Sequence, residues 1–138
     1  MKYRRWIGVL SIVLGGVAWT APGMLQAASN AGDGYTIEDL ELDSAGDLVD
    51  VCTIETGHPD HDTALAFCYG FFEGAFHYDD AISASSNYID LVCSPPGTTQ
   101  QQAVEVFLTY MEANPRYYAE QPIDALFRAL VAQWPCSD

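Results

Sequence analysis

The spacing of apolar residues along the chain predicts helices and no strand. Ser44, with Asp47 three residues later, has the form of a helix N-cap, and a first helix is expected to continue through Leu48, Val49 and Cys52. Gly57 and Pro59 mark a loop over 53–62. A second helix is expected from 62 or 63 to about 83, and its predicted apolar face consists of Ala64, Phe67, Cys68, Phe71, Ala75 and Tyr78.

Two further helices are predicted in the last third of the chain. The pair Thr99 and Gln102 signals a helix start that follows the rigid connector 83–97, and Asn114-Pro115 signals its end. The last helix has the clearest apolar stripe, and Pro135 ends it. The predicted fold is all-α, a small four-helix, roughly up-and-down domain. The stripe of the last helix consists of Ile123, Leu126, Phe127, Leu130, Val131 and Trp134.

Two glycines lie inside the second predicted helix. Gly70 and Gly74 each cost about 1 kcal/mol in a helix interior relative to alanine. Close packing of a neighbouring helix against a side without Cβ atoms would offset this cost. The segment is apolar nearly all round, so it is either the central helix of the domain or one side of a subunit interface.

Four cysteines predict two disulfides, with three possible pairings. Zinc is disfavoured because the closest pair, Cys52 and Cys68, is 16 residues apart and no Cys-x-x-Cys occurs. Sequential helices joined by short loops are antiparallel neighbours, which brings Cys52 to Cys68 and Cys93 to Cys136. A bridge between Cys68 and Cys93 would have to span most of the second helix.

The first residues have the form of a secretory signal peptide. Lys2, Arg4 and Arg5 precede an uncharged run of 14 residues, which is shorter than the about 20 that span a bilayer. We expect residues 1–27 to be removed by cleavage near Ala27, and the mature protein to be periplasmic with no membrane anchor. Residues 28–43 then form an acidic, partly ordered N-terminal arm, and 44–138 form the helical domain.

Removal of the leader would leave a strongly acidic protein. Only Arg116 and Arg128 remain against 19 acidic residues, a formal charge of −17 without histidines and termini. Such a field repels nucleic acid and favours basic protein partners, although solubility alone also accounts for a high surface charge.

No stretch of the chain predicts catalysis or a cofactor. The sequence His58-Pro59-Asp60-His61-Asp62 contains metal-ligand types, but we interpret it as a polar loop because no further ligand stands at a helical spacing. Cys68 with His77 could be drawn as a nucleophile pair only if the cysteine were reduced. We therefore expect no enzyme activity, no metal and no cofactor.

Aromatic residues are too numerous for one small core. Exposed tyrosines on a rigid scaffold suit protein recognition. Tyr110, Tyr117 and Tyr118, together with Arg116, surround the turn between the last two helices and are the candidate partner-binding residues.

The order of short motifs resembles the Rap/Tai family of type VI secretion immunity proteins over about residues 44–137. The motifs are Leu48-Val49-Asp50-Val51-Cys52, Phe67-Cys68-Tyr69-Gly70-Phe71-Phe72-Glu73-Gly74, Cys93-Ser94-Pro95, the stretch from Gln100 to Pro115, and Ala129-Leu130 to Trp134-Pro135-Cys136.

The resemblance implies a periplasmic helical protein, often a homodimer, that binds a peptidoglycan amidase effector and blocks its active-site cleft. It implies no catalytic residue and no cofactor. The alternative is a periplasmic acid-stress chaperone, also helical and disulfide-bonded, because acid would discharge so many carboxylates.

Overall fold

The computed structural model describes residues 34–85 and 90–136, and every regular element in this part of the chain is a helix. The predicted class, the four α-helices and the two disulfides are confirmed. The predicted leader and its cleavage site lie outside the described residues. No helix of the described part is long and apolar enough to span a membrane. In chain order the elements are the 3-10 helix η1 (Ile37–Glu41), α1 (Ala45–Cys52), α2 (His61–Ser83), α3 (Gln100–Ala113), the 3-10 helix η2 (Pro115–Tyr117) and α4 (Pro122–Gln133).

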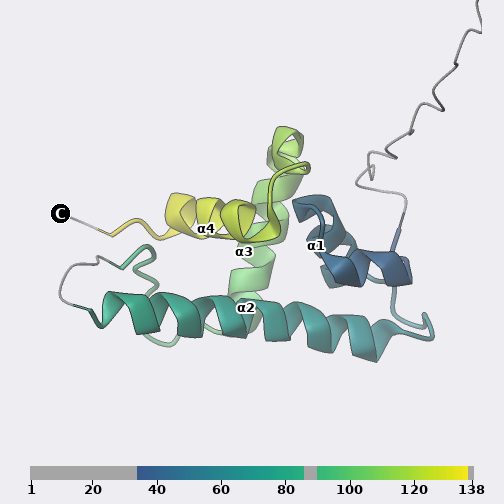
Figure 1. Cartoon of the computed structure of the whole chain (residues 1–138), viewed down its shortest axis with the longest axis horizontal. Helices are drawn as coiled ribbons and strands as arrows, with labels where there is room; N and C mark the ends of the chain where they lie inside the picture. The colour runs from purple at the N-terminus through teal and green to yellow at the C-terminus, as the bar shows by residue number, and fades with distance from the viewer. Residues whose placement is uncertain (1–33, 86–89, 137–138) are drawn as a thin grey trace, which may run out of the picture.

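Helix α1 is short and packs against η1, α2 and α4, over the amino-terminal half of α2 (Figure 1). Its predicted cap is confirmed: the Asp47 N–H donates to Ser44 Oγ (3.3 Å), and the Ser44 N–H donates to the Asp47 carboxylate (2.9 Å). Leu48 and Val51 are fully buried. Because an eight-residue helix is marginal alone, this burial and the cap hold it in place.

Part of the acidic arm is ordered against α1. The sequence pattern did not predict η1, which begins with a capping box of Thr36 and Asp39 and ends at Leu42, a non-glycine residue with φ 53°. Leu40 and Leu42 pack against the core and connect the arm to α1. Residues 28–33 of the arm lie outside the described part.

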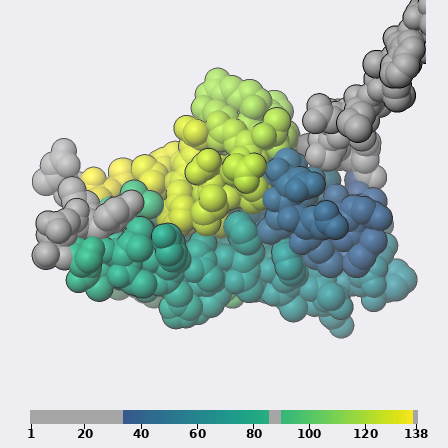
Figure 2. Space-filling model, viewed as in Figure 1, coloured from purple at the N-terminus to yellow at the C-terminus, as the bar shows by residue number. Residues whose placement is uncertain are grey.

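Helix α2 lies along one edge of the molecule, and only one side of it is covered (Figures 1 and 2). The predicted apolar face is partly wrong, because Phe67 and Tyr78 are 37% and 67% exposed. The helices that pack on α2, α1 and α3, meet a neighbouring face instead. The buried residues of α2 are Ala64, Cys68, Phe72, Ala75 and Asp79.

The two glycines of α2 are not packed against another helix of the domain. A Cβ atom added at Gly70 or at Gly74 would meet no atom within 4 Å. The close packing predicted for this side is therefore absent within the described residues of the domain, and the glycines face outward.

Helix α3 crosses α2, and α4 in turn crosses α3, so that α2 and α4 run in roughly the same line in this view (Figure 1). Phe72 of α2 and Phe107 of α3 meet edge to face, with ring centroids 5.7 Å apart. The predicted stripe of α4 is only partly correct, because Ile123 and Val131 are 39% and 38% exposed. The face of α4 toward α1 and α3 carries small residues that allow close approach, and it consists of Ala125, Leu126, Ala129 and Leu130.

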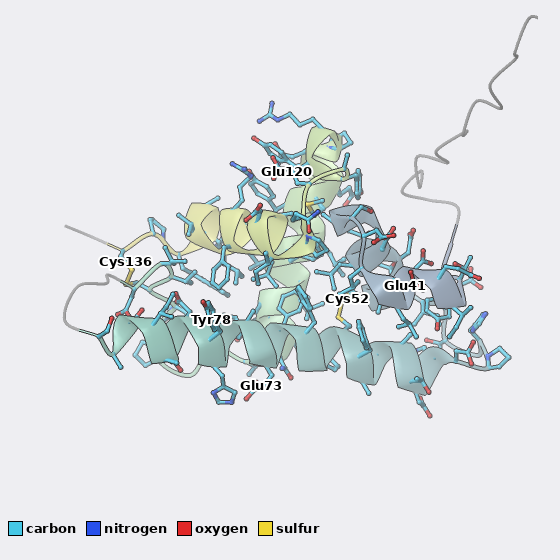
Figure 3. All side chains as sticks on the ribbon, viewed as in Figure 1. Glu41, Cys52, Glu73, Tyr78, Glu120 and Cys136 are labelled. Atoms are coloured by element: carbon cyan, nitrogen blue, oxygen red, sulfur yellow. A yellow bond between two sulfur atoms is a disulfide. The ribbon has the colours of Figure 1, made fainter. Side chains whose placement is uncertain are left out.

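Both predicted disulfides are present. Cys52–Cys68 joins the end of α1 to α2, with Cα atoms 5.3 Å apart, and is visible between these helices in Figure 3. Cys93–Cys136 joins the segment before α3 to the segment after α4, with Cα atoms 4.9 Å apart. The Cys93 N–H also donates to the Trp134 carbonyl (3.0 Å), so these two segments run side by side.

Candidate functional site

The two arginines that follow the predicted leader converge on one tyrosine. The guanidinium carbons of Arg116 and Arg128 lie 4.6 Å and 4.5 Å from the centroid of the Tyr117 ring. Arg116 also donates to Tyr117 Oη (2.9 Å). An aromatic face attracts cations through its quadrupole, and each such contact contributes about 0.5–1 kcal/mol at an exposed site. We call Tyr110, Arg116, Tyr117, Glu120 and Arg128 the Tyr117 cluster.

Tyr110 extends the cluster onto α3. Its ring stacks on Tyr117 with centroids 6.0 Å apart and planes inclined by 7°. Burial raises the pKa of Tyr110, and the neighbouring Tyr117 raises it further, so this phenol is neutral at physiological pH. The Asn114 side-chain amide donates to the Tyr110 carbonyl (2.9 Å) and fixes the end of α3 beneath the stack.

An ion pair anchors the other side of the cluster. Arg128 donates to both carboxylate oxygens of Glu120, at 3.1 Å and 3.2 Å, and this pairing raises the pKa of Arg128. The Glu120 backbone carbonyl accepts from the Ala45 N–H (2.8 Å) at the start of α1. Bidentate pairing is the geometry in which arginine holds a carboxylate most specifically. The cluster is thus connected to the start of α1.

Three of the four candidate partner-binding residues lie together, and the fourth has another environment. Tyr110, Arg116 and Tyr117 belong to the Tyr117 cluster. Tyr118 is half-buried, and its carbonyl accepts from the Gly46 N–H (2.9 Å), so its backbone caps α1. Burial and then the nearby carboxylate of Asp50 raise the pKa of Tyr118.

Neither Arg128 nor Glu120 was predicted to be a site residue. Arg128 is the only lysine or arginine besides Arg116 that follows the predicted leader. The small number of basic residues could therefore have pointed to Arg128 in the sequence. Glu120 gave no signal of its own, since 19 acidic residues occur in the chain.

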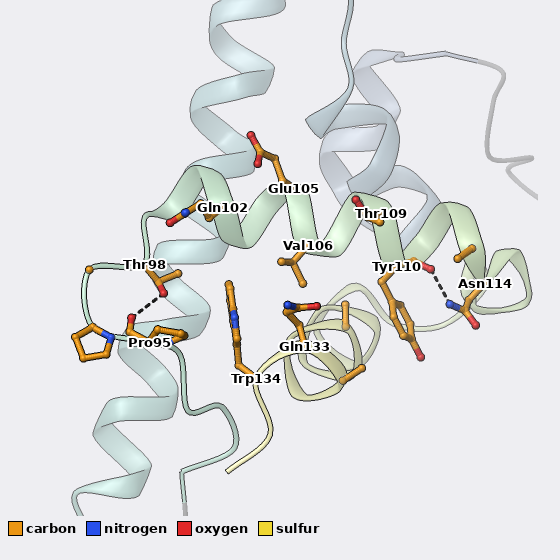
Figure 4. A pocket seen from close by; sticks show the side chains of 15 residues that line it. Pro95, Thr98, Gln102, Glu105, Val106, Thr109, Tyr110, Asn114, Gln133 and Trp134 are labelled. Atoms are coloured by element: carbon orange, nitrogen blue, oxygen red, sulfur yellow. Dashed lines mark hydrogen bonds between the residues drawn. The ribbon is translucent and has the colours of Figure 1, made fainter. Parts of the chain in front are cut away.

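An open groove of about 800 Å³ continues from Tyr110 between α3, α4 and the loop 95–98 (Figure 4). Val106 and Ala132 line its sides, and Trp134 stands between the loop and α3. Glu105 is the one acidic or basic residue among those that line the groove. The groove and the Tyr117 cluster share Tyr110 and form one continuous surface.

The histidines and Cys68 lie in the loop before α2 and on α2 itself. His58 lies 4.0 Å from Asp60 and His61 lies 3.2 Å from Asp62, but the described part of the chain has no group of three or more metal-ligating side chains. Cys68 is bridged and has no thiolate. His77 pairs with Glu73 at 3.1 Å on the outer side of α2, where Figure 3 labels Glu73.

Comparison with known proteins identifies a family for most of the chain. A family model described as Rap1a immunity proteins matches residues 44–136, from the N-cap of α1 to the last cysteine. No curated protein and no solved structure gives a significant match to the chain. The matched range contains the four α-helices, both disulfides and the whole Tyr117 cluster.

Proposed function

This chain belongs to the Rap1a immunity protein family, and from this membership we propose that it is a periplasmic protein that binds and blocks a type VI secretion peptidoglycan amidase effector. Membership supports an immunity-type role, which is binding to a protein effector without catalysis. The effector class, the compartment and the contacting residues are the parts that we propose.

The convergence of both arginines on Tyr117 is the observation that carries the choice of binding surface. Tyrosine and arginine dominate the energetics of protein interfaces, because they combine a large contact area with hydrogen-bonding groups. Here the stack on Tyr110 and the Glu120 ion pair already fix the positions of Tyr117 and Arg128. A pre-ordered surface loses less conformational entropy on binding.

Charge supports the same assignment. The chain after the predicted leader carries 19 acidic residues and two arginines, so its field accelerates encounter with a basic effector. The exposed Arg116 then offers the docked effector a donor for an acidic side chain or a backbone carbonyl. The acidic residues therefore provide the long-range attraction, and the positively charged Arg116 provides a local contact.

The periplasm is supported by the two disulfides, since such bridges persist in oxidising compartments. The signal-peptide pattern of residues 1–27 predicts the same location.

A homodimer is the second part of the proposal. The outer face of α2 exposes Phe67 and Tyr78 beside the open backbone of Gly70 and Gly74, where a second helix could approach closely. We expect light scattering to give the mass of a dimer and Gly74→Leu to shift it toward a monomer. Gln101→Leu, at an exposed position of α3, is the matched control. A monomeric wild-type protein would overturn this part alone.

Protection of cells tests the main proposal. A candidate type VI secretion peptidoglycan amidase from the source organism is directed to the periplasm of a laboratory host, with or without this chain. We expect lysis without the chain, survival with it, and inhibition of the purified amidase by an equimolar amount. Full amidase activity in a molar excess of this protein would contradict the proposal.

Two variants locate the surface. Arg116→Ala removes an exposed side chain of the Tyr117 cluster, and we expect binding to the amidase to weaken at least about tenfold, as for an interface hot spot. Ile37→Ala, a 61% exposed residue on η1, is the control and should bind as the wild type does. Equal affinity of both variants would move the binding surface elsewhere while leaving the immunity role intact.

A further inference from the structure

We propose that the groove between α3 and α4 binds an extended, proline-containing segment of a protein partner, with a basic residue next to the prolines. The groove is distinct from the Tyr117 cluster except for the shared Tyr110. The assignment of the segment to the amidase rests on the proposed function, whereas the chemistry of the groove does not.

The walls of the groove favour proline rings. Trp134 stands at the end near Pro95, and Tyr110 lies at the opposite end (Figure 4). Apolar side chains, Val106 and Ala132, lie between them. Aromatic-lined grooves bind polyproline II segments, because the preformed helix packs its rings on flat apolar surfaces with little loss of entropy.

Hydrogen-bond donors at the groove match the backbone of such a segment. Polyproline II has no internal hydrogen bonds, so its carbonyl groups need external donors. Gln133 offers an exposed side-chain amide, and Trp134 offers its indole N–H. Neither side chain makes a hydrogen bond within the described residues of the chain.

The length of the groove and the charge of its lining restrict which peptide segments can bind there. The groove follows α3 from Gln102 to Asn114, which is about 18 Å at a rise of 1.5 Å per residue. This length accommodates roughly six residues of polyproline II at 3.1 Å each. Glu105 is the single charged residue of the lining and the whole chain is acidic, so a lysine or arginine beside the prolines is favoured and an acidic segment is repelled.

Tryptophan fluorescence provides a direct test. Trp134 is the only tryptophan after the predicted leader, so its emission reports on the groove. The probe is the acetylated peptide of six prolines and one lysine, and the control peptide replaces the prolines with alternating glycine and serine. We expect the mature protein to give a saturable emission change with the proline peptide and at least about tenfold weaker binding of the control. Trp134→Phe gives the background.

A pair of variants on α4 tests the location. Ala132→Phe fills the groove from an exposed position, and we expect at least a tenfold loss of affinity for the proline peptide. Val131→Phe introduces the same side chain at the preceding position, which does not line the groove. This variant should bind the peptide as the wild type does. Circular dichroism of both variants checks that each is folded.

The outcomes separate this inference from the proposed function. No binding of the proline peptide at millimolar concentration, or equal binding of the glycine-serine peptide, would overturn the groove proposal even if the amidase is neutralised. A change of oligomeric state in Ala132→Phe, with peptide binding intact, would also overturn it and assign the groove to a second copy. Peptide binding without amidase inhibition would support the groove and contradict the immunity proposal.

Discussion

Helices α1 and α2 lie side by side and share a disulfide, yet their surroundings are opposite. Seven of the eight residues of α1 are buried, whereas five of the 23 residues of α2 are. The short helix depends on its neighbours, because η1, α2, α4 and the carbonyls of Tyr118 and Glu120 all contact it. The long helix packs against α1 and α3 on one side, and the rest of the domain leaves most of its surface uncovered. Length and structural importance are therefore separate properties of the helices in this fold.

Truncation of one apolar residue in each helix should show the largest difference. Leu48→Ala in α1 removes a fully buried side chain, and we expect it to lower the free energy of unfolding by about 2–5 kcal/mol through lost burial and a residual cavity. Phe67→Ala in α2 removes a side chain that is 37% exposed, and in the monomer at low micromolar concentration it should cost about 1 kcal/mol or less. Urea denaturation followed by circular dichroism measures both. Equal losses would show that the exposed face of α2 is covered in solution.

Removal of the shared bridge should have the next largest effect. Cys52→Ser with Cys68→Ser opens a loop with a separation of 16 residues, for which the chain-entropy model predicts about 3 kcal/mol. The same model gives roughly 4 kcal/mol for the 43-residue separation of Cys93–Cys136. Cys68 is fully buried, so its replacement by serine also buries a hydroxyl group. We expect the first double variant to lose at least as much stability as the second, as measured by thermal denaturation.

Replacing a glycine by alanine should change the free energy of unfolding in opposite directions in α1 and α2. Gly74→Ala in α2 adds a methyl group to open space, and we expect a gain of about 0.5–1 kcal/mol in the monomer. Gly46→Ala in α1 places a Cβ atom 3.3 Å from Ser44 Oγ, which the cap with Asp47 holds in position, so we expect a loss. Denaturation at low micromolar concentration compares the two. A loss of stability in the monomeric Gly74→Ala protein would contradict the open face.

The smallest expected effect depends on pH and concerns the end of α2. Asp79 is 7% exposed, and one of its carboxylate oxygens has no hydrogen-bond partner in the described structure. Burial raises the pKa of Asp79, the carboxylates of Asp90 and Asp80 add to the rise, and the Leu91 N–H opposes it.

Because its folded-state pKa is raised, Asp79 stabilises the fold fully only below its unfolded pKa, and this contribution is lost as the pH rises through the folded pKa. We expect Asp79→Asn to be more stable than the wild type at pH 7, and the difference to shrink toward pH 3. Parallel denaturation curves of both proteins at several pH values measure this difference. Glu55→Gln, at an exposed position that does not contribute to the shift of Asp79, is the control. A variant that is less stable than the wild type at pH 7 would show that the charged carboxylate is needed there.

Local signals in the sequence predicted the parts of the fold that depend on neighbouring residues. The caps at Ser44 and Thr99 were recognisable because each pairs with a residue three positions later. The stop at Pro115 is also local, and helix order then gave the disulfide pairing. Helix α2 starts one residue before the predicted range, at His61.

The buried faces of α2 and α4 could not be predicted in full, because both helices carry apolar residues on more than one side. Phe71 and Phe72 are adjacent and equally apolar, but only Phe72 is fully buried in the core, where its ring meets Phe107. The Tyr117 cluster was half predicted for a similar reason. Arg128 reaches Tyr117 from another helix, and the backbone of Tyr118 turns toward α1, so both depend on how the helices pack.

The positions of the four cysteines determine the order in which the two disulfides can form during export. In a chain that crosses a membrane with its amino end first, Cys52 and Cys68 both emerge before any residue of α3 or α4. Their bridge can close while the rest of the chain is still in transit. Cys136 emerges 43 residues after Cys93, so the native bridge of Cys93 cannot form during that interval. The half of the domain that carries the groove and the Tyr117 cluster is therefore the last to be locked.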